Sequence, residues 1–253
     1  VRQEKVPVSI ISFVRAGAPC KDSQRPPRFF HQLCGQLEAI RIGSGPRVMG
    51  LYTRFILPKV VEFTCSMKPS MRQRAKVVPF ALGSVLEVGF GSGLNLPFYD
   101  KTKVQHVWAL DPSREMWALA EERVRGAGFP VEFLNAAAEE IPLPNRSADT
   151  VLVTFTLCTL PDVRRALREM ARVLKPGGEL VYCEHGLAPD ENVRRWQDRL
   201  NPMWKAFGGG CNLNRPIPSL LEQGGFRMRE MSSMYIPGWR PASFNYWGRA
   251  SGA

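Results

Sequence analysis

One short segment joins an apolar strand to a run of alternating glycines, and it reads Val85-Leu86-Glu87-Val88-Gly89-Phe90-Gly91-Ser92-Gly93. Glycines after a buried strand let the backbone approach a ligand closely, because no Cβ stands in the way. A dinucleotide site needs the pattern G-x-G-x-x-G, and Leu94 occupies its last position here. Glu87 would also repel a pyrophosphate. The motif therefore favours a ligand that has a cationic amino-acid end and no phosphate.

Further candidate residues follow the later strands expected in this chain. Ligands of an open parallel sheet bind at the carboxyl ends of its strands. The second strand ends at Asp111-Pro112, where a carboxylate can accept hydrogen bonds from both hydroxyls of a ribose or simply cap the next helix. After the third strand, Ala138 and Glu139 suit the edge of a flat adenine. The fourth strand leads into residues 156–160, which would face the reacting group.

The elements that position these residues alternate between strand and helix, which predicts a parallel sheet with helices on both faces. Strands are expected over 84–88, 105–110, 131–134, 150–155, 179–184, 226–231 and 244–249. Helices are expected over 113–127, 162–174, 191–207 and 218–224. Asp162 can cap the helix over 162–174, which has the clearest apolar stripe, and Lys175-Pro176-Gly177-Gly178 would end it.

The stretch over 49–78 has a helical pattern that Pro58 interrupts, and a second helix rich in Arg and Lys is expected over 70–78. Helices placed just before the first strand can cover a cofactor pocket. The alternative is a packing helix with a basic outer face.

These motifs, in this order, resemble the class I S-adenosylmethionine (SAM) methyltransferases over residues 49–253. Within the family, Cys183-Glu184-His185-Gly186 and the segment over 210–215 resemble the branch of the microsomal thiol S-methyltransferases of animals and their bacterial relatives. The animal enzymes carry a hydrophobic membrane anchor before the fold that this sequence does not show. The resemblance implies an α/β, Rossmann-like fold with a mostly parallel seven-stranded sheet and helices on both faces.

The resemblance also implies SAM as cofactor and S-adenosylhomocysteine as product. Cofactor contacts fall on Glu87, Gly89, Gly91, Gly93, Asn95, Asp111, Pro112, Ala138, Glu139, Thr154 and Thr156. Glu87 would help to hold the charged amino-acid end. The sulfonium of SAM is an excellent leaving group, so the enzyme must mainly align nucleophile and methyl, a proximity effect of roughly 7–11 kcal/mol. No metal is expected.

The expected acceptor is a small thiol, which reacts as the thiolate. His185, at the end of the fifth strand, is the candidate base or the residue that orients one. Cys158 is a second candidate for a catalytic role, and Cys211, Asn212 and Arg215 are candidates for acceptor binding. Each has a structural alternative: a hydrogen-bonded His, a small buried Cys, or a cap within a loop.

Three functions are weighed. The first is SAM-dependent, metal-independent methyl transfer to a small thiol or sulfide of the methanethiol or hydrogen sulfide type. The second is transfer to a phospholipid amine or a quinone-like apolar acceptor. The third is a SAM-fold protein without catalysis that binds RNA or a partner, which the intact glycine motif argues against. The chain also lacks the Asn/Asp-Pro-Pro-aromatic turn typical of enzymes that methylate the amines of DNA bases, so no nucleic acid is expected as partner.

Composition sets the wider limits. The chain has 253 residues, of which 44% are hydrophobic, and a formal charge of +11. The charge indicates either contact with an anionic membrane surface or simply a solvated basic surface. The cysteines are scattered without disulfide or zinc spacing, which favours a reducing, cytoplasmic location. Residues 1–48 are expected to be an irregular basic extension before a methyltransferase domain over 49–253, and we hypothesise that the natural start is Met49.

Overall fold

The computed structural model describes residues 56–252. The predictions for residues 1–48, for a start at Met49 and for the beginning of the helical stretch after it lie outside the described residues. The helices are α3 (Leu57–Cys65), α4 (Lys68–Val77), α5 (Arg114–Arg125), α6 (Val163–Val173), α7 (Glu191–Phe207) and α8 (Ile217–Gln223). The strands are β1 (Gly83–Val88), β2 (Val104–Leu110), β3 (Val131–Leu134), β4 (Ala148–Thr154), β5 (Leu174–His185), β6 (Phe226–Tyr235) and β7 (Phe244–Gly252).

The described strands form a 7-stranded sheet in the order β3-β2-β1-β4-β5-β7-β6. The pairs from β3 to β5 are parallel, whereas β7 runs antiparallel to both β5 and β6. The prediction of a Rossmann-like, mostly parallel seven-stranded sheet is therefore confirmed.

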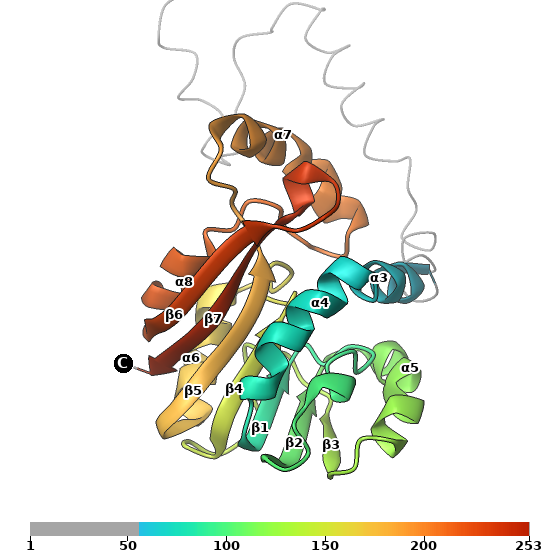
Figure 1. The fold of residues 1–253 in the computed structure, drawn as a ribbon, viewed down its shortest axis with the longest axis vertical. Helices are drawn as coiled ribbons and strands as arrows, with labels where there is room; N and C mark the ends of the chain where they lie inside the picture. Colours follow the sequence, from blue (N-terminus) through green and yellow to red (C-terminus); the bar gives the residue numbers. More distant parts are fainter. Residues whose placement is uncertain (1–55, 253) are drawn as a thin grey trace, which may run out of the picture. The chain divides into compact units, whose positions relative to one another are not determined.

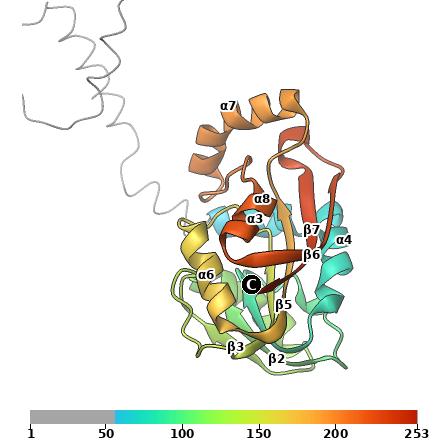
Figure 2. The same cartoon turned by 90° about the vertical axis from the view of Figure 1, so that its left-hand side faces the viewer.

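Alternate side chains of the central strands face two separate apolar layers. Leu86 and Val88 of β1 pack into a cluster with buried residues of α6 and α8. Val85 packs into the other cluster, together with Val77 of α4 and Ala120 of α5. Figure 2 shows α4 and α6 on opposite sides of the sheet. Helices thus cover both faces, as expected for strands that are apolar on both sides.

Two helices lie beyond the ends of the parallel strands: α3, which precedes β1, and α7, which lies between β5 and β6 in the chain. Pro58 lies in the first turn of α3, where its missing N–H costs no helical hydrogen bond, and the preceding part of the predicted helical stretch lies outside the described residues. Both α3 and α7 lie beyond the carboxyl ends of the parallel strands (Figure 1). Among residues 56–252, no helix is long and apolar enough to cross a bilayer.

Several strand boundaries differ from the prediction: β6 and β7 continue to Tyr235 and Gly252, and the ends of β4 and β5 differ near the site. β5 begins at Leu174 and includes the Lys-Pro-Gly-Gly segment, because Ala148 pairs with Leu174 before the register shifts so that Thr150 pairs with Glu179. Phe155, expected to end the fourth strand, lies just after β4 with a φ of 53°. This left-handed conformation is unusual for a bulky residue, and it turns the chain sharply at the carboxyl end of β4.

Candidate functional site

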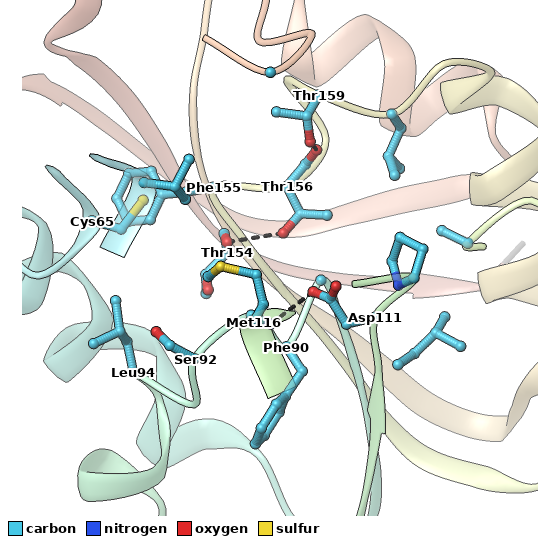
Figure 3. Close-up of a pocket in the computed structure, with 18 of the residues that line it drawn as sticks. Cys65, Phe90, Ser92, Leu94, Asp111, Met116, Thr154, Phe155, Thr156 and Thr159 are labelled. Atoms are coloured by element: carbon cyan, nitrogen blue, oxygen red, sulfur yellow. Dashed lines mark hydrogen bonds between the residues drawn. The ribbon is translucent and has the colours of Figure 1, made fainter. Parts of the chain in front are cut away.

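A cavity of about 550 Å³ opens at the carboxyl ends of β1, β2 and β4. Its floor is the glycine turn after β1, its sides come from the segments after β2, β3 and β4, and α3 and the turn after α7 complete it. Figure 3 shows Asp111, Thr154, Thr156 and Met116 directed toward this space. The predicted cofactor residues that line it are Gly89, Gly91, Asp111, Pro112, Ala138, Glu139, Thr154 and Thr156.

The glycine turn is held in a conformation that side chains with a Cβ rarely adopt. Gly89, Gly91 and Gly93 have φ values of 72°, 58° and 77°. At Gly89 the space is also filled, because an added Cβ would lie 2.2 Å from Oγ1 of Thr156. The ends of β1 and β4 therefore meet only because position 89 has no side chain.

Asp111 is fixed by two backbone hydrogen bonds. Its Oδ2 accepts from the N–H of Gly91 at 2.8 Å (Figure 3). Its Oδ1 accepts from the N–H of Ser113 at 2.8 Å. Each oxygen keeps a second acceptor position, which suits a pair of hydroxyls. Burial raises the pKa of this carboxyl, and the two hydrogen bonds act in the opposite direction. The carboxylate thus joins the glycine turn to the start of α5 at the edge of the cavity.

Glu87 lies beneath the glycine turn and does not line the cavity. Its oxygens accept hydrogen bonds from Nδ2 of Asn95 at 2.9 Å and from the hydroxyl of Tyr99 at 2.6 Å. Burial raises its pKa to about 7, although both hydrogen bonds and Arg74 favour the charged form. Asn95 is likewise buried behind the wall, so the structure places both predicted contacts one layer below the cavity.

Arg74 is a cavity residue that the sequence analysis missed. It is only 5% exposed, and its Nη1 donates to Oδ1 of Asn95 at 2.9 Å and to Oγ1 of Thr154 at 2.5 Å. Its Nε has no partner among the described residues, and its guanidinium lies 5.1 Å from the ring centroid of Phe155. The available signal was its spacing of three from Val77, which puts both on the buried face of α4. A cation is therefore present at the sheet end of the cavity.

α3 lies over the glycine turn through an ionic contact that was also not predicted. Glu62 accepts from Nη2 of Arg123 at 2.8 Å and from the hydroxyl of Ser92, while Nη1 of Arg123 donates to the carbonyl of Ser92 at 2.9 Å. Leu57 and Cys65 of the same helix line the cavity. Burial raises the pKa of the Cys65 thiol and so favours its neutral form, whereas Glu62 of the same helix also lines the cavity and pairs with Arg123.

The residues predicted for catalysis and acceptor binding lie together, but none lines the cavity. Cys158, His185 and Cys211 form one cluster, in which Nε2 of His185 is 3.2 Å from Sγ of Cys211. The cluster is separated from the cavity by residues such as Thr156 and Thr159, which do line it. His185 is therefore not placed to take a proton directly from a molecule in the cavity.

Asn212 and Arg215 hold two loops together. Nδ2 of Asn212 donates to the carbonyls of Cys158 and Gly210, both at 2.9 Å. The guanidinium of Arg215 donates to the carbonyls of Leu157 and Leu160. All these acceptors are backbone atoms, so the two side chains fix the loop after β4 against the loop after α7.

The pKa values of the three side chains in this cluster are shifted in different directions. The pKa of Cys211 is lowered to about 4, first because Cys158 hydrogen-bonds its sulfur and also because His185 lies beside it, while burial opposes the shift. The same hydrogen bond, together with burial, raises the pKa of Cys158 well above its usual value. Burial disfavours the charged form of His185, but the neighbouring Cys211 outweighs it and the pKa is raised. The two thiols therefore share one proton.

Comparison with known proteins shows that the chain is similar to methyltransferases in both sequence and fold. A family model described as a methyltransferase domain matches residues 86–182. Thiol S-methyltransferase TMT1B of Homo sapiens is 32% identical over 81% of this chain and 84% of its own length. Phosphatidylethanolamine N-methyltransferase of Cereibacter sphaeroides is 42% identical, but over 41% of this chain and 51% of its own length. A SAM-dependent methyltransferase structure from Aquifex aeolicus has a TM-score of 0.52 at 21% identity, covers 76% of this chain and 97% of its own, and shares the fold.

We predict that Gly89→Ala lowers the free energy of unfolding by about 1–3 kcal/mol more than Gly177→Ala, because the new methyl group would overlap Thr156. Gly177 is the matched control, since its φ of 79° carries the same backbone strain and nothing lies within 4 Å of an added Cβ. Urea denaturation followed by circular dichroism measures both. Equal losses would mean that the contact with Thr156 is not what excludes a side chain.

Proposed function

The chain belongs to the class I SAM-dependent methyltransferases, in the branch that contains thiol S-methyltransferases, and from this premise we propose that it methylates the sulfur of a small thiol or sulfide. Methanethiol and hydrogen sulfide represent the acceptor class. The observation that carries the proposal is the similarity to a thiol S-methyltransferase over 84% of that protein's length. The part of the cavity near Leu57 and Cys65 is apolar, which suits a small sulfur acceptor.

Three features of the cavity fit SAM. The backbone at Gly89 and Gly91 is bare, so a ligand can lie against it. Asp111 has free acceptor positions for the ribose hydroxyls, and Ala138 with Glu139 would border the adenine. Arg74, whose guanidinium lines the cavity, would bind the carboxylate of the amino-acid end.

Glu87 acts from behind this site. Its carboxyl group accepts a hydrogen bond from Asn95, which in turn accepts one from Arg74, and it attracts Arg74 directly. Glu87 would thus orient these two residues without contacting the cofactor. The methyl group of bound SAM is electrophilic without a metal. The protein must therefore exclude water and hold the acceptor in line, which is where most of the rate would come from.

The acceptor would occupy the part of the cavity bounded by α3 and the segment after β4, near Leu57, Cys65 and Thr159. A free thiol has a pKa near 8.5, so about a tenth or less is thiolate at neutral pH. Because His185 does not line the cavity, we propose that the acceptor enters as the thiolate formed in solution. The chain then contributes alignment and an apolar surrounding, and His185 and Cys158 contribute no direct proton transfer.

A phospholipid amine is the second candidate, favoured by the similarity to phosphatidylethanolamine N-methyltransferase. A phospholipid acceptor would be reached from a membrane surface. The outer face of α3 exposes Val60 and Phe63, and the residues that flank the helix expose Ile56 and Met67, with Lys59 and Lys68 beside them. Apolar side chains flanked by lysines are typical of contact with anionic lipid. We therefore propose peripheral contact with a membrane through the outer face of α3.

We predict that Asp111→Ala and Arg74→Met each weaken SAM binding by about 10- to 100-fold, because each removes charged hydrogen bonds of about 1.5–3 kcal/mol apiece. Isothermal titration calorimetry measures the dissociation constants. Asp100→Ala is the control, since Asp100 lies outside the cavity and bonds only to Thr102 and Lys103. If the two variants bind SAM as tightly as the Asp100 variant does, the proposed cofactor site is wrong.

We predict that the protein transfers label from methyl-labelled SAM to methanethiol, giving dimethyl sulfide, and to hydrogen sulfide, giving methanethiol. Vesicles of phosphatidylethanolamine are offered in parallel, and Asp111→Ala protein serves as the blank. Volatile labelled product would support the thiol acceptor. Label found only in the lipid would replace it with the phospholipid amine, and SAM binding without transfer to either acceptor would contradict both.

We predict that the protein floats with vesicles containing anionic lipid and that Phe63→Ser weakens this binding about 10-fold, since burying a Phe side chain contributes about 1.5–3 kcal/mol. Phe63 is 71% exposed on α3. Leu119→Ser is the matched control, because Leu119 is also exposed but lies on α5. Equal flotation of the two variants, or no difference between anionic and neutral vesicles, would argue against this surface.

A further inference from the structure

Three metal-ligating side chains converge behind the cavity. Cys158 follows β4, His185 ends β5 and Cys211 follows α7. Their ligand atoms all lie within 4.8 Å of one another, and Nε2 of His185 is 3.2 Å from Sγ of Cys211. The residues are far apart in sequence, so no short spacing motif could have revealed the set. Neither the methyl transfer proposed above nor the cofactor site uses them.

The backbone around the cluster is fixed independently of the three ligands. The N–H and Nδ2 of Asn212 both donate to the carbonyl of Cys158 at 2.9 Å. Arg215 donates to the carbonyls of Leu157 and Leu160, on either side of Cys158. These bonds hold the two cysteine loops together without any covalent link. The ligand positions are therefore preorganised by the fold.

We propose that Cys158, His185 and Cys211 bind one Zn²⁺ ion. Two thiolates and an imidazole are a donor set that selects a soft or borderline cation over Mg²⁺ or Ca²⁺. In a tetrahedral zinc site, Zn–S bonds of about 2.3 Å and Zn–N bonds of about 2.0–2.1 Å put ligand atoms about 3.5–3.8 Å apart. The observed separations are close enough that small side-chain rotations would complete the site.

The electrostatic surroundings also fit a cation. Cys158 is 2% exposed, and Glu184, beside His185, is fully buried. Arg215 interacts electrostatically with Cys158 and Cys211, but its guanidinium is directed to the carbonyls of Leu157 and Leu160. Zn²⁺ would displace the one proton that the two thiols share, and any proton on the ligating nitrogen of His185, to solvent, and no electrons are transferred. Three protein ligands leave a fourth position for water or another small donor.

Such an ion would tie together the ends of β4, β5 and α7. Residues adjoining its ligands, Thr156 and Thr159 on one side and Gly208 and Gly209 on the other, line the cavity. The metal would therefore fix one wall of the acceptor site without entering it. This proposal departs from the expectation of a metal-free protein, and it does not depend on which acceptor is used.

The test uses the reduced, full-length chain after removal of metals with a chelator. Titration with Zn²⁺ against a chromophoric chelator gives affinity and stoichiometry, and Co²⁺ serves as a spectroscopic probe. We expect tight binding, thiolate-to-cobalt charge-transfer absorption and strong tetrahedral d–d bands. Cys211→Ser and His185→Gln should each weaken zinc binding by more than the roughly 10- to 100-fold that loss of an outer-shell partner produces.

Cys183→Ala is the control, because this buried cysteine lies outside the cluster. The chain also carries Cys20, His31 and Cys34, so the site is assigned by the variants and not by stoichiometry alone. Circular dichroism verifies folding, and Zn²⁺ should raise the melting temperature of the parent and of Cys183→Ala but not of Cys211→Ser. The proposal is overturned if the parent binds no Zn²⁺, if Cys211→Ser and His185→Gln bind it as the control does, or if the cobalt spectrum lacks thiolate bands.

Discussion

The approach of Gly89 to Thr156 sets the geometry on which the site depends. With a Cβ only 2.2 Å from the threonine hydroxyl, any other residue would force the ends of β1 and β4 apart. The same turn directs the N–H of Gly91 at Asp111, which fixes the end of β2 relative to β1. The closely held ends of these strands give the cavity a rigid floor. Rigidity suits methyl transfer, because that reaction depends on the alignment of the acceptor with the methyl group more than on proton transfer.

A buried polar network supports this floor from below. Arg74, Asn95, Glu87 and Tyr99 are buried and joined by hydrogen bonds. Of these four residues, Arg74 alone also lines the cavity. A ligand carboxylate that binds its guanidinium there would add a charged hydrogen bond to the network. Binding and the stability of this region are therefore expected to be coupled.

The sequence predicted those parts of the site that the backbone alone determines. Glycines at positive φ and an acid at a strand end are set by local geometry, so Gly89 and Asp111 could be found from spacing. Arg74 and Glu62 could not, because their roles depend on how α4 and α3 pack against a sheet that begins later in the chain. His185 was placed correctly at the end of β5, but one layer of side chains separates it from the cavity, and spacing along a strand cannot show this depth.

The two halves of the cavity are built with different constraints. The cofactor half rests on paired strands, whereas the acceptor half comes from α3 and the turn after α7. These two segments pack closely, because a Cβ added at Gly209 would lie only 3.0 Å from the side chain of Leu57. α7 is anchored mainly by Gln197, whose Nε2 donates to the carbonyls of Gly186, Leu213 and Pro241. Changes in α3 can therefore alter the acceptor without disturbing the floor. Such a separation agrees with the names of similar proteins, which include a thiol S-methyltransferase and a phosphatidylethanolamine N-methyltransferase.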